Sequence, residues 1–116
     1  MYKKPVDFIA ELQYKTIEEG GRSTPVWSGY RPQVKFPFSE MQTSGQQVFL
    51  DKEIVYPGDK VNAEITIISD TYFAGQLYLG LEFEFREGSR IIGTGIIKEI
   101  VNPILLTTAP NTSLLP

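Results

Sequence analysis

The sequence contains no cysteine and no histidine. The lack of cysteine excludes a disulfide framework, thiolate zinc sites and thiol nucleophiles. The lack of histidine removes the one side chain whose unperturbed pKa lies between about pH 5 and 8, and with it the usual general base, the serine–histidine–aspartate triad and most transition-metal chemistry. We therefore expect a protein that is not an enzyme and that uses no cofactor and no metal.

The sequence also has no long apolar run and no excess of positive charge. No stretch approaches the roughly 18 apolar residues that a transmembrane helix needs, and the first residues do not read as a signal peptide, so we expect a cytoplasmic protein without membrane contact. Eleven basic residues face fourteen acidic ones, a formal net charge of −3. This balance opposes a broad attraction to phosphate backbones. The length of 116 residues fits one domain.

What the sequence does contain is alternation of apolar and polar residues with a period of two, and no long window has a helical stripe. In the clearest strand, residues 77–86, the side chains predicted to face the core are Leu77, Leu79, Leu81, Phe83 and Phe85. In the first strand, the face that includes Asp7 is predicted to be mostly solvated. The expected strands cover residues 8–14, 34–38, 47–50, 61–67, 77–86 and 91–101. They predict an all-β fold, a closed six-stranded antiparallel Greek-key barrel, with a flat sandwich as the alternative.

The segments between these strands have turn signals. Residues 15–32 are rich in glycine, proline and serine and predict a long structured loop, and residues 56–59 fit a type II turn. Gly93 and Gly95 in the last strand predict a tight bend or a close approach of backbone. Residues 1–101 are expected to form the domain and residues 102–116 a flexible C-terminal tail.

Few residues suggest a catalytic or ligand-binding site. The paired carboxylates Glu82 and Glu84 could serve a small hydrolase or a metal-dependent enzyme, but their alternation predicts an outward, solvated face. The glycines of the chain lack the spacing of nucleotide-binding loops, so no nucleotide is expected. Basic and aromatic residues do alternate in the long loop, where Trp27 and Tyr30 either cap one end of the barrel or contact a partner.

Three motifs then resemble one known family, the third, C-terminal domain of translation elongation factor Tu. Residues 18–33 read EEGGRSTPVWSGYRPQ, residues 57–59 read PGD and residues 85–95 read FREGSRIIGTG. Their order is that of the family, and together they cover about residues 7–101. The resemblance implies a six-stranded antiparallel barrel. There are departures: Ser23 stands where the family has histidine, Val26 and Trp27 replace two phenylalanines, Ser89 replaces a glycine, and residues 39–55 match poorly.

The resemblance also implies binding roles. In the family this domain packs against a GTPase domain and contacts the T-stem of aminoacyl-tRNA. Positions that resemble tRNA-contacting ones, and would bind RNA or another partner, are Arg22, Gln33, Thr43, Glu87 and Gly88. Gly20, Gly21 and Gln33 resemble positions at the seam with the GTPase domain. The residues expected at a protein interface are Gly20, Gly21, Trp27, Tyr30 and Arg31.

We therefore expect a stand-alone binding module. It would dock a protein partner or a structured, tRNA-like RNA through the loop of residues 20–33 and the hairpin of residues 86–90, and the acidic net charge favours a protein. Without a GTPase domain in the sequence, GTP binding and hydrolysis are not expected. A hydrolase that uses surface carboxylates is the alternative from a different class.

Overall fold

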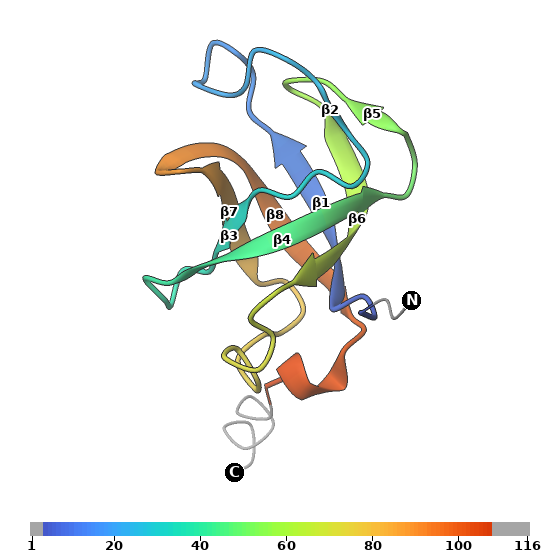
Figure 1. The fold of residues 1–116 in the computed structure, drawn as a ribbon, viewed down its shortest axis with the longest axis vertical. Helices are drawn as coiled ribbons and strands as arrows, with labels where there is room; N and C mark the ends of the chain where they lie inside the picture. Colours follow the sequence, from blue (N-terminus) through green and yellow to red (C-terminus); the bar gives the residue numbers. More distant parts are fainter. Residues whose placement is uncertain (1–3, 108–116) are drawn as a thin grey trace.

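The computed structural model describes residues 4–107, and the regular secondary structure in this range is almost entirely β-strand (Figure 1). The strands are β1 (Phe8–Tyr14), β2 (Val26–Trp27), β3 (Gln33–Lys35), β4 (Gln42–Phe49), β5 (Ile54–Val55), β6 (Lys60–Ile67), β7 (Glu82–Glu87) and β8 (Arg90–Ile100). Six of them close a barrel in the order β1-β6-β4-β3-β7-β8, while β2 and β5 form a separate two-stranded ribbon. The prediction of a closed six-stranded barrel is confirmed.

The topology of the barrel is a Greek key. Strands β3, β4 and β6 follow one another as antiparallel neighbours, and β1 lies beside β6. Strand β1 also pairs with β8, which closes the barrel. Closure leaves no free sheet edge among these six strands, so the barrel offers no ladder for edge-to-edge aggregation.

Alternating side chains build the core, as the period of two predicted. In β1, Phe8, Ala10, Leu12 and Tyr14 are buried, and in β6 every second residue from Val61 is buried. Aromatic rings fill one end of the barrel, where Phe36 lies at the centre. Its ring is 4.9 Å from that of Phe73 and 5.9 Å from that of Phe83, both in edge-on geometry.

The two glycines of β8 lie where rings from the neighbouring strand pass over them. A Cβ added to Gly93 would stand 2.1 Å from Cζ of Phe85, and one added to Gly95 would stand 2.4 Å from Cζ of Phe83. The predicted close approach is therefore confirmed. The turn at residues 56–59 is confirmed too, because Gly58 has a φ of 90° and the amide of Asp59 donates to the carbonyl of Tyr56.

The strand predicted over residues 77–86 is shorter than expected. Strand β7 begins only at Glu82, and residues 79–80 form a turn in which Gly80 has a φ of 87°. As a result Leu79 is 61% exposed, and its predicted place in the core is wrong. Leu77 is buried as predicted, but it pairs with Leu106 in an isolated bridge and not in the barrel.

Two further differences concern strands that the sequence signalled weakly. Strand β4 runs from Gln42, whereas only residues 47–50 were predicted, because its first half consists of polar and glycine residues. The loop of residues 15–32 contains β2, which pairs with β5. A strand of two residues is too short to show the alternation that predicts a strand from the sequence.

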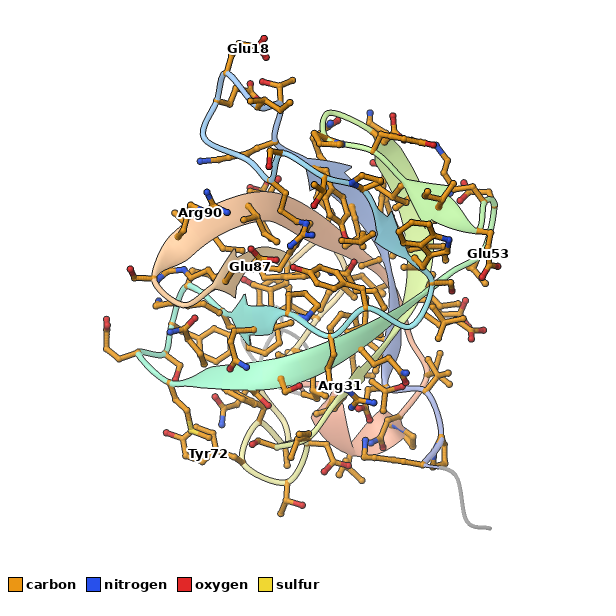
Figure 2. The ribbon with its side chains drawn as sticks, turned by 45° about the horizontal axis from the view of Figure 1, so that its top comes forward. Glu18, Arg31, Glu53, Tyr72, Glu87 and Arg90 are labelled. Carbon is orange, nitrogen blue, oxygen red and sulfur yellow. The ribbon has the colours of Figure 1, made fainter. Side chains whose placement is uncertain are left out.

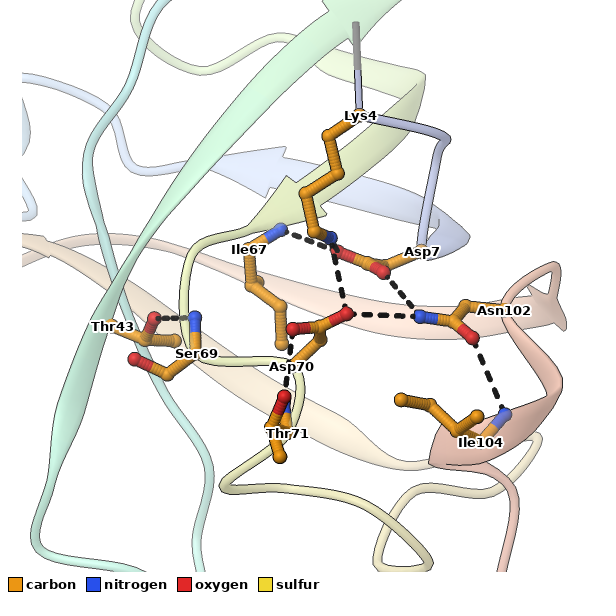
Figure 3. Close-up of polar contacts among 9 residues, drawn as sticks. All are labelled: Lys4, Asp7, Thr43, Ile67, Ser69, Asp70, Thr71, Asn102 and Ile104. Carbon is orange, nitrogen blue, oxygen red and sulfur yellow. Dashed lines mark hydrogen bonds and ion pairs between the residues drawn. The ribbon is translucent and has the colours of Figure 1, made fainter. Parts of the chain in front are cut away.

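The largest difference lies at the lower end of the barrel in Figure 1, and Figure 3 shows its contacts. Asp7, predicted to face solvent, is completely buried. Its carboxylate accepts hydrogen bonds from Nζ of Lys4 (2.6 Å), the amide of Ile67 (2.8 Å) and Nδ2 of Asn102 (2.8 Å). Buried carboxylates are stable only with such partners. This network ties the N-terminal segment, the end of β6 and the segment after β8 together.

Part of the predicted C-terminal tail belongs to this network. Asn102 caps a short 3-10 helix (Pro103–Leu105), Leu105 is completely buried, and the amide of Thr107 donates to the carbonyl of Leu77. The prediction of a flexible tail therefore needs correction for residues 102–107, while its remainder lies outside the described residues. That 3-10 helix is the single helix in residues 4–107, and no helix there could cross a membrane.

Candidate functional site

The loop of residues 20–33 and the hairpin of residues 86–90 lie side by side and share one carboxylate. Glu87, at the end of β7, accepts hydrogen bonds at Oε2 from the Arg22 guanidinium and the Tyr30 hydroxyl, and at Oε1 from Nη2 of Arg90 (3.5 Å). Figure 2 shows Glu87 and Arg90 close to each other at the hairpin between β7 and β8. We call these four residues the Glu87 cluster. It joins the two segments that the sequence singled out separately.

Local hydrogen bonds between backbone and side chains hold the start of the loop in shape. Thr16 and Glu19 exchange hydrogen bonds, since the amide of Thr16 donates to Oε1 of Glu19 (2.8 Å) and the amide of Glu19 donates to Oγ1 of Thr16 (3.1 Å). Gly20 then has a φ of 94°, which favours glycine. A Cβ on Gly21 would stand 2.4 Å from the carbonyl oxygen of Lys15. Both glycines therefore serve the turn that leads the chain to Arg22.

The guanidinium of Arg22 makes several contacts within the domain. Besides Glu87 it contacts Thr24, with Nη2 donating to Oγ1 at 2.9 Å, and it lies 5.3 Å from the centre of the Tyr30 ring. Burial alone would lower the pKa of Arg22, but the hydrogen bond and charge of Glu87, together with Tyr30, raise it above its usual value. The cation is permanent, and its main function in this arrangement is to hold the loop.

The same contacts set the pKa values of the other members. Burial alone would raise the pKa of Glu87, yet hydrogen bonds from Tyr30 and Arg22 outweigh it and lower that pKa. Burial, followed by the hydrogen bond to Glu87, raises the pKa of Tyr30, so its hydroxyl keeps its proton and donates. At neutral pH the cluster is thus an ionised carboxylate held by donors from both segments.

Behind the cluster lies a buried polar pair that the sequence analysis missed. Tyr14, whose pKa burial raises, donates its hydroxyl proton to Oε1 of Gln47, and its ring packs 4.8 Å from that of Phe85. Gln47 is completely buried, and its Nε2 has no hydrogen-bond partner within residues 4–107. The alternation of Gln47 with Phe49 would have placed this amide inward, but nothing in the sequence indicates its partner.

The other predicted site residues are not part of the cluster. Gly88 is exposed at the tip of the hairpin with a φ of 64°, and Gln33 is half-buried in β3, paired with Ser44 and Arg86. Thr43 is buried, and its hydroxyl accepts a hydrogen bond from the amide of Ser69 at 3.2 Å. Figure 2 places the exposed Arg31 away from Glu87 and Arg90.

The carboxylates considered for catalysis lie on the outer face of β7. A groove of about 550 Å³ passes over this face, and its lining includes Lys35, Tyr78, Glu82, Glu84 and Arg86. Glu84 is held by Arg86, with Nε donating to Oε1 at 3.0 Å. Within the described part of the chain, no group of three or more aspartates, glutamates, histidines or cysteines could hold a metal ion. On this face Glu84 and Arg86 thus form an ion pair along one strand.

A pH dependence tests the contribution of Glu87. In unfolded chains a glutamate has a pKa of about 4.3, and the folded value is lower, so the Glu87 contacts stabilise the fold above that pH and are lost as the pH falls through the folded pKa. We expect the Glu87→Gln variant to unfold at lower urea concentration than the wild type at neutral pH. The difference should shrink below about pH 4. A difference that does not change with pH would contradict this assignment.

The comparison with known families agrees with this geometry. The model of the elongation factor Tu C-terminal domain matches residues 2–101, a span that includes the whole barrel, the loop and the hairpin. This family is a non-catalytic domain. The chain therefore belongs to the elongation factor Tu C-terminal domain family.

Proposed function

We propose that this domain is a non-catalytic binding module that docks a cytoplasmic protein partner on the surface formed by residues 20–33 and 86–90. The observation that supports this proposal best is the Glu87 cluster. It fixes two loops from distant parts of the sequence in one arrangement, and a surface that is ordered in advance loses less conformational entropy on binding.

The charges near the cluster favour a protein over a nucleic acid. Arg22 is neutralised by Glu87, and Arg86 by Glu84, so two of the nearby arginines are occupied. The net charge of −3 gives no wider attraction to phosphate. A surface of mixed, paired charges fits the polar rim of a protein interface.

Structured RNA is the second candidate, and one observation favours it. Arg90 is 57% exposed and holds Glu87 by a single contact at 3.5 Å, next to the exposed backbone of Gly88. An exposed guanidinium beside an open glycine backbone can hold phosphate and ribose without reading bases.

Site-specific photo-crosslinking in cells tests the proposal. A photo-reactive residue at Ser89, exposed at the hairpin tip, should give a discrete protein adduct, whereas the same residue at Glu99, exposed on β8, should not. The Glu87→Ala variant should lose the Ser89 adduct because the loop is no longer held. Equal adducts from both positions, or no adduct from Ser89, would refute the proposed surface.

Labelled tRNA in a salt series decides between the two candidates. If RNA is the ligand, log K should fall with log salt by about 0.7 to 0.9 per phosphate contacted, and Arg90→Ala should reduce that slope by about 1. For a protein-binding module we expect weak tRNA binding that Arg90→Ala leaves unchanged. Arg90 is a sharper choice than Arg22, whose loss would also release the loop.

A further inference from the structure

The ribbon of β2 and β5 has an apolar outer face beside the barrel. Val26 and Val55 are buried against the core, so the alternation turns their neighbours Trp27 and Ile54, which pair across the ribbon, outward. Trp27 is 59% exposed and is the only tryptophan of the chain. No other ring and no cation of the described residues stacks on its indole.

The turn between β4 and β5 adds to this face. The hydroxyl of Ser28 accepts a hydrogen bond from the amide of Phe49 (3.0 Å), and the amide of Ser28 donates to the carbonyl of Glu53 (2.9 Å). These bonds hold residues 49–53 against β2, next to Trp27. Leu50, in that turn, is half exposed. We call Trp27, Leu50, Ile54 and the acidic residues of the turn the Trp27 patch.

The charge at the edge of this patch is negative. Asp51 and Glu53 are exposed, and neither forms an ion pair within the described chain. Asp51 accepts only from Asn62, at 3.4 Å. The cation between them, Lys52, is bound to Asp59 at 3.7 Å. The open indole face attracts a cation through a cation–π interaction. The two carboxylates without an ion-pair partner attract it by their negative charge.

We propose that the Trp27 patch binds a segment of a partner protein that carries an arginine or lysine next to an aliphatic residue. The cation would lie over the indole and near Glu53, and the aliphatic side chain would pack on Leu50 and Ile54. Tryptophan and arginine are among the residues enriched at binding hot spots. The carboxylates repel phosphate, which disfavours RNA at this site.

The proposal rests on the proposed function as a protein-binding module, and it specifies the chemistry of the partner at the Trp27 side of the loop, away from the Glu87 cluster. Trp27 lies on the side of the loop that contacts residues 49–53, whereas Tyr30, three residues later, reaches Glu87. Figure 2 shows Glu53 and Glu87 well apart. The patch can therefore be changed at Glu53 without replacing a member of the Glu87 cluster.

Because Trp27 is the only tryptophan, its fluorescence reports binding at this patch directly. The probe is a short soluble peptide in which arginine alternates with leucine. The controls are peptides with glutamate for arginine and with glycine for leucine. We expect a saturable change of Trp27 emission with the first peptide, at least about threefold weaker binding for each control, and weakening at high salt.

Two variants with the same reversal of charge test whether peptide binding depends on the carboxylate at the patch. Glu53→Lys should weaken the arginine–leucine peptide by about three- to tenfold, whereas Glu99→Lys, equally exposed on β8, should leave it unchanged. If the arginine–leucine peptide did not bind but the Ser89 adduct formed, the proposal for the Trp27 patch would be overturned and the proposed function would stand.

Three results would overturn the proposal. The first is an equal response to the glutamate peptide, or none to the arginine–leucine peptide. The second is a change of Trp27 emission with protein concentration and without peptide, which would show that a second copy covers the patch. The third is quenching by labelled tRNA, which would assign the patch to RNA.

Discussion

Replacing Asp7 with alanine is expected to lower the free energy of unfolding by about 3 to 5 kcal/mol, the usual effect of breaking a buried ion pair. Asp7 is completely buried and accepts hydrogen bonds from Lys4, Ile67 and Asn102. Its removal leaves the amide of Ile67 and the amide group of Asn102 without this acceptor. Such a loss is a large share of the about 5 to 15 kcal/mol that stabilises a typical domain.

Equilibrium unfolding in urea measures this loss, and Asp51→Ala is the matched control. Asp51 is exposed and makes only contacts of 3.4 Å with Asn62, so its removal should cost no more than about 0.5 kcal/mol. Asp7→Asn should fall between the two, because it retains one acceptor oxygen and loses the charge. If Asp7→Ala and Asp51→Ala proved equally stable, the network of Figure 3 would not contribute to stability.

The case of Asp7 shows where sequence reasoning on the fold reaches its limit. Alternation identified the barrel strands, because a period of two follows directly from backbone geometry. It could not identify a carboxylate that is buried for the sake of partners distant in sequence, since Asn102 is 95 residues away. Leu79 failed for a related reason: an apolar residue in register was turned outward by the left-handed conformation of Gly80.

The candidate site, like the fold, was predictable from the sequence only in part. The loop and the hairpin were identified from motifs that resemble the family, and the structure brings Arg22, Tyr30 and Glu87 together. That Glu87 serves as the acceptor for both segments was not predictable, because it depends on pairing between β3 and β7 and on the path of the loop. Thr43 was predicted to bind RNA or another partner, but in the structure its hydroxyl accepts a hydrogen bond from within the domain. The RNA-contacting roles carried over from the family stay predictions.

Replacing Gly93 with alanine should lower the free energy of unfolding by about 3 kcal/mol, the upper end of the usual effect of overpacking a core. The added Cβ would stand 2.1 Å from Cζ of Phe85 and 2.8 Å from the carbonyl oxygen of Gln13. The ring of Phe85 cannot swing away freely, because it packs against Tyr14. The carbonyl oxygen of Gln13 is backbone and can move only with β1.

A double-mutant cycle separates the steric effect from the general effect of losing a glycine. Phe85→Leu removes the ring atoms that the methyl group added by Gly93→Ala would meet, so the double variant should be more stable than the sum of the single changes predicts, by at least about 0.5 kcal/mol. Gly88→Ala is the control for backbone strain without a clash: its φ is 64°, nothing lies within 4 Å of the added Cβ, and it should cost about 1 kcal/mol. Strict additivity in the cycle would mean that Phe85 yields without cost. The close passage of rings over β8 would then not be what requires glycine there.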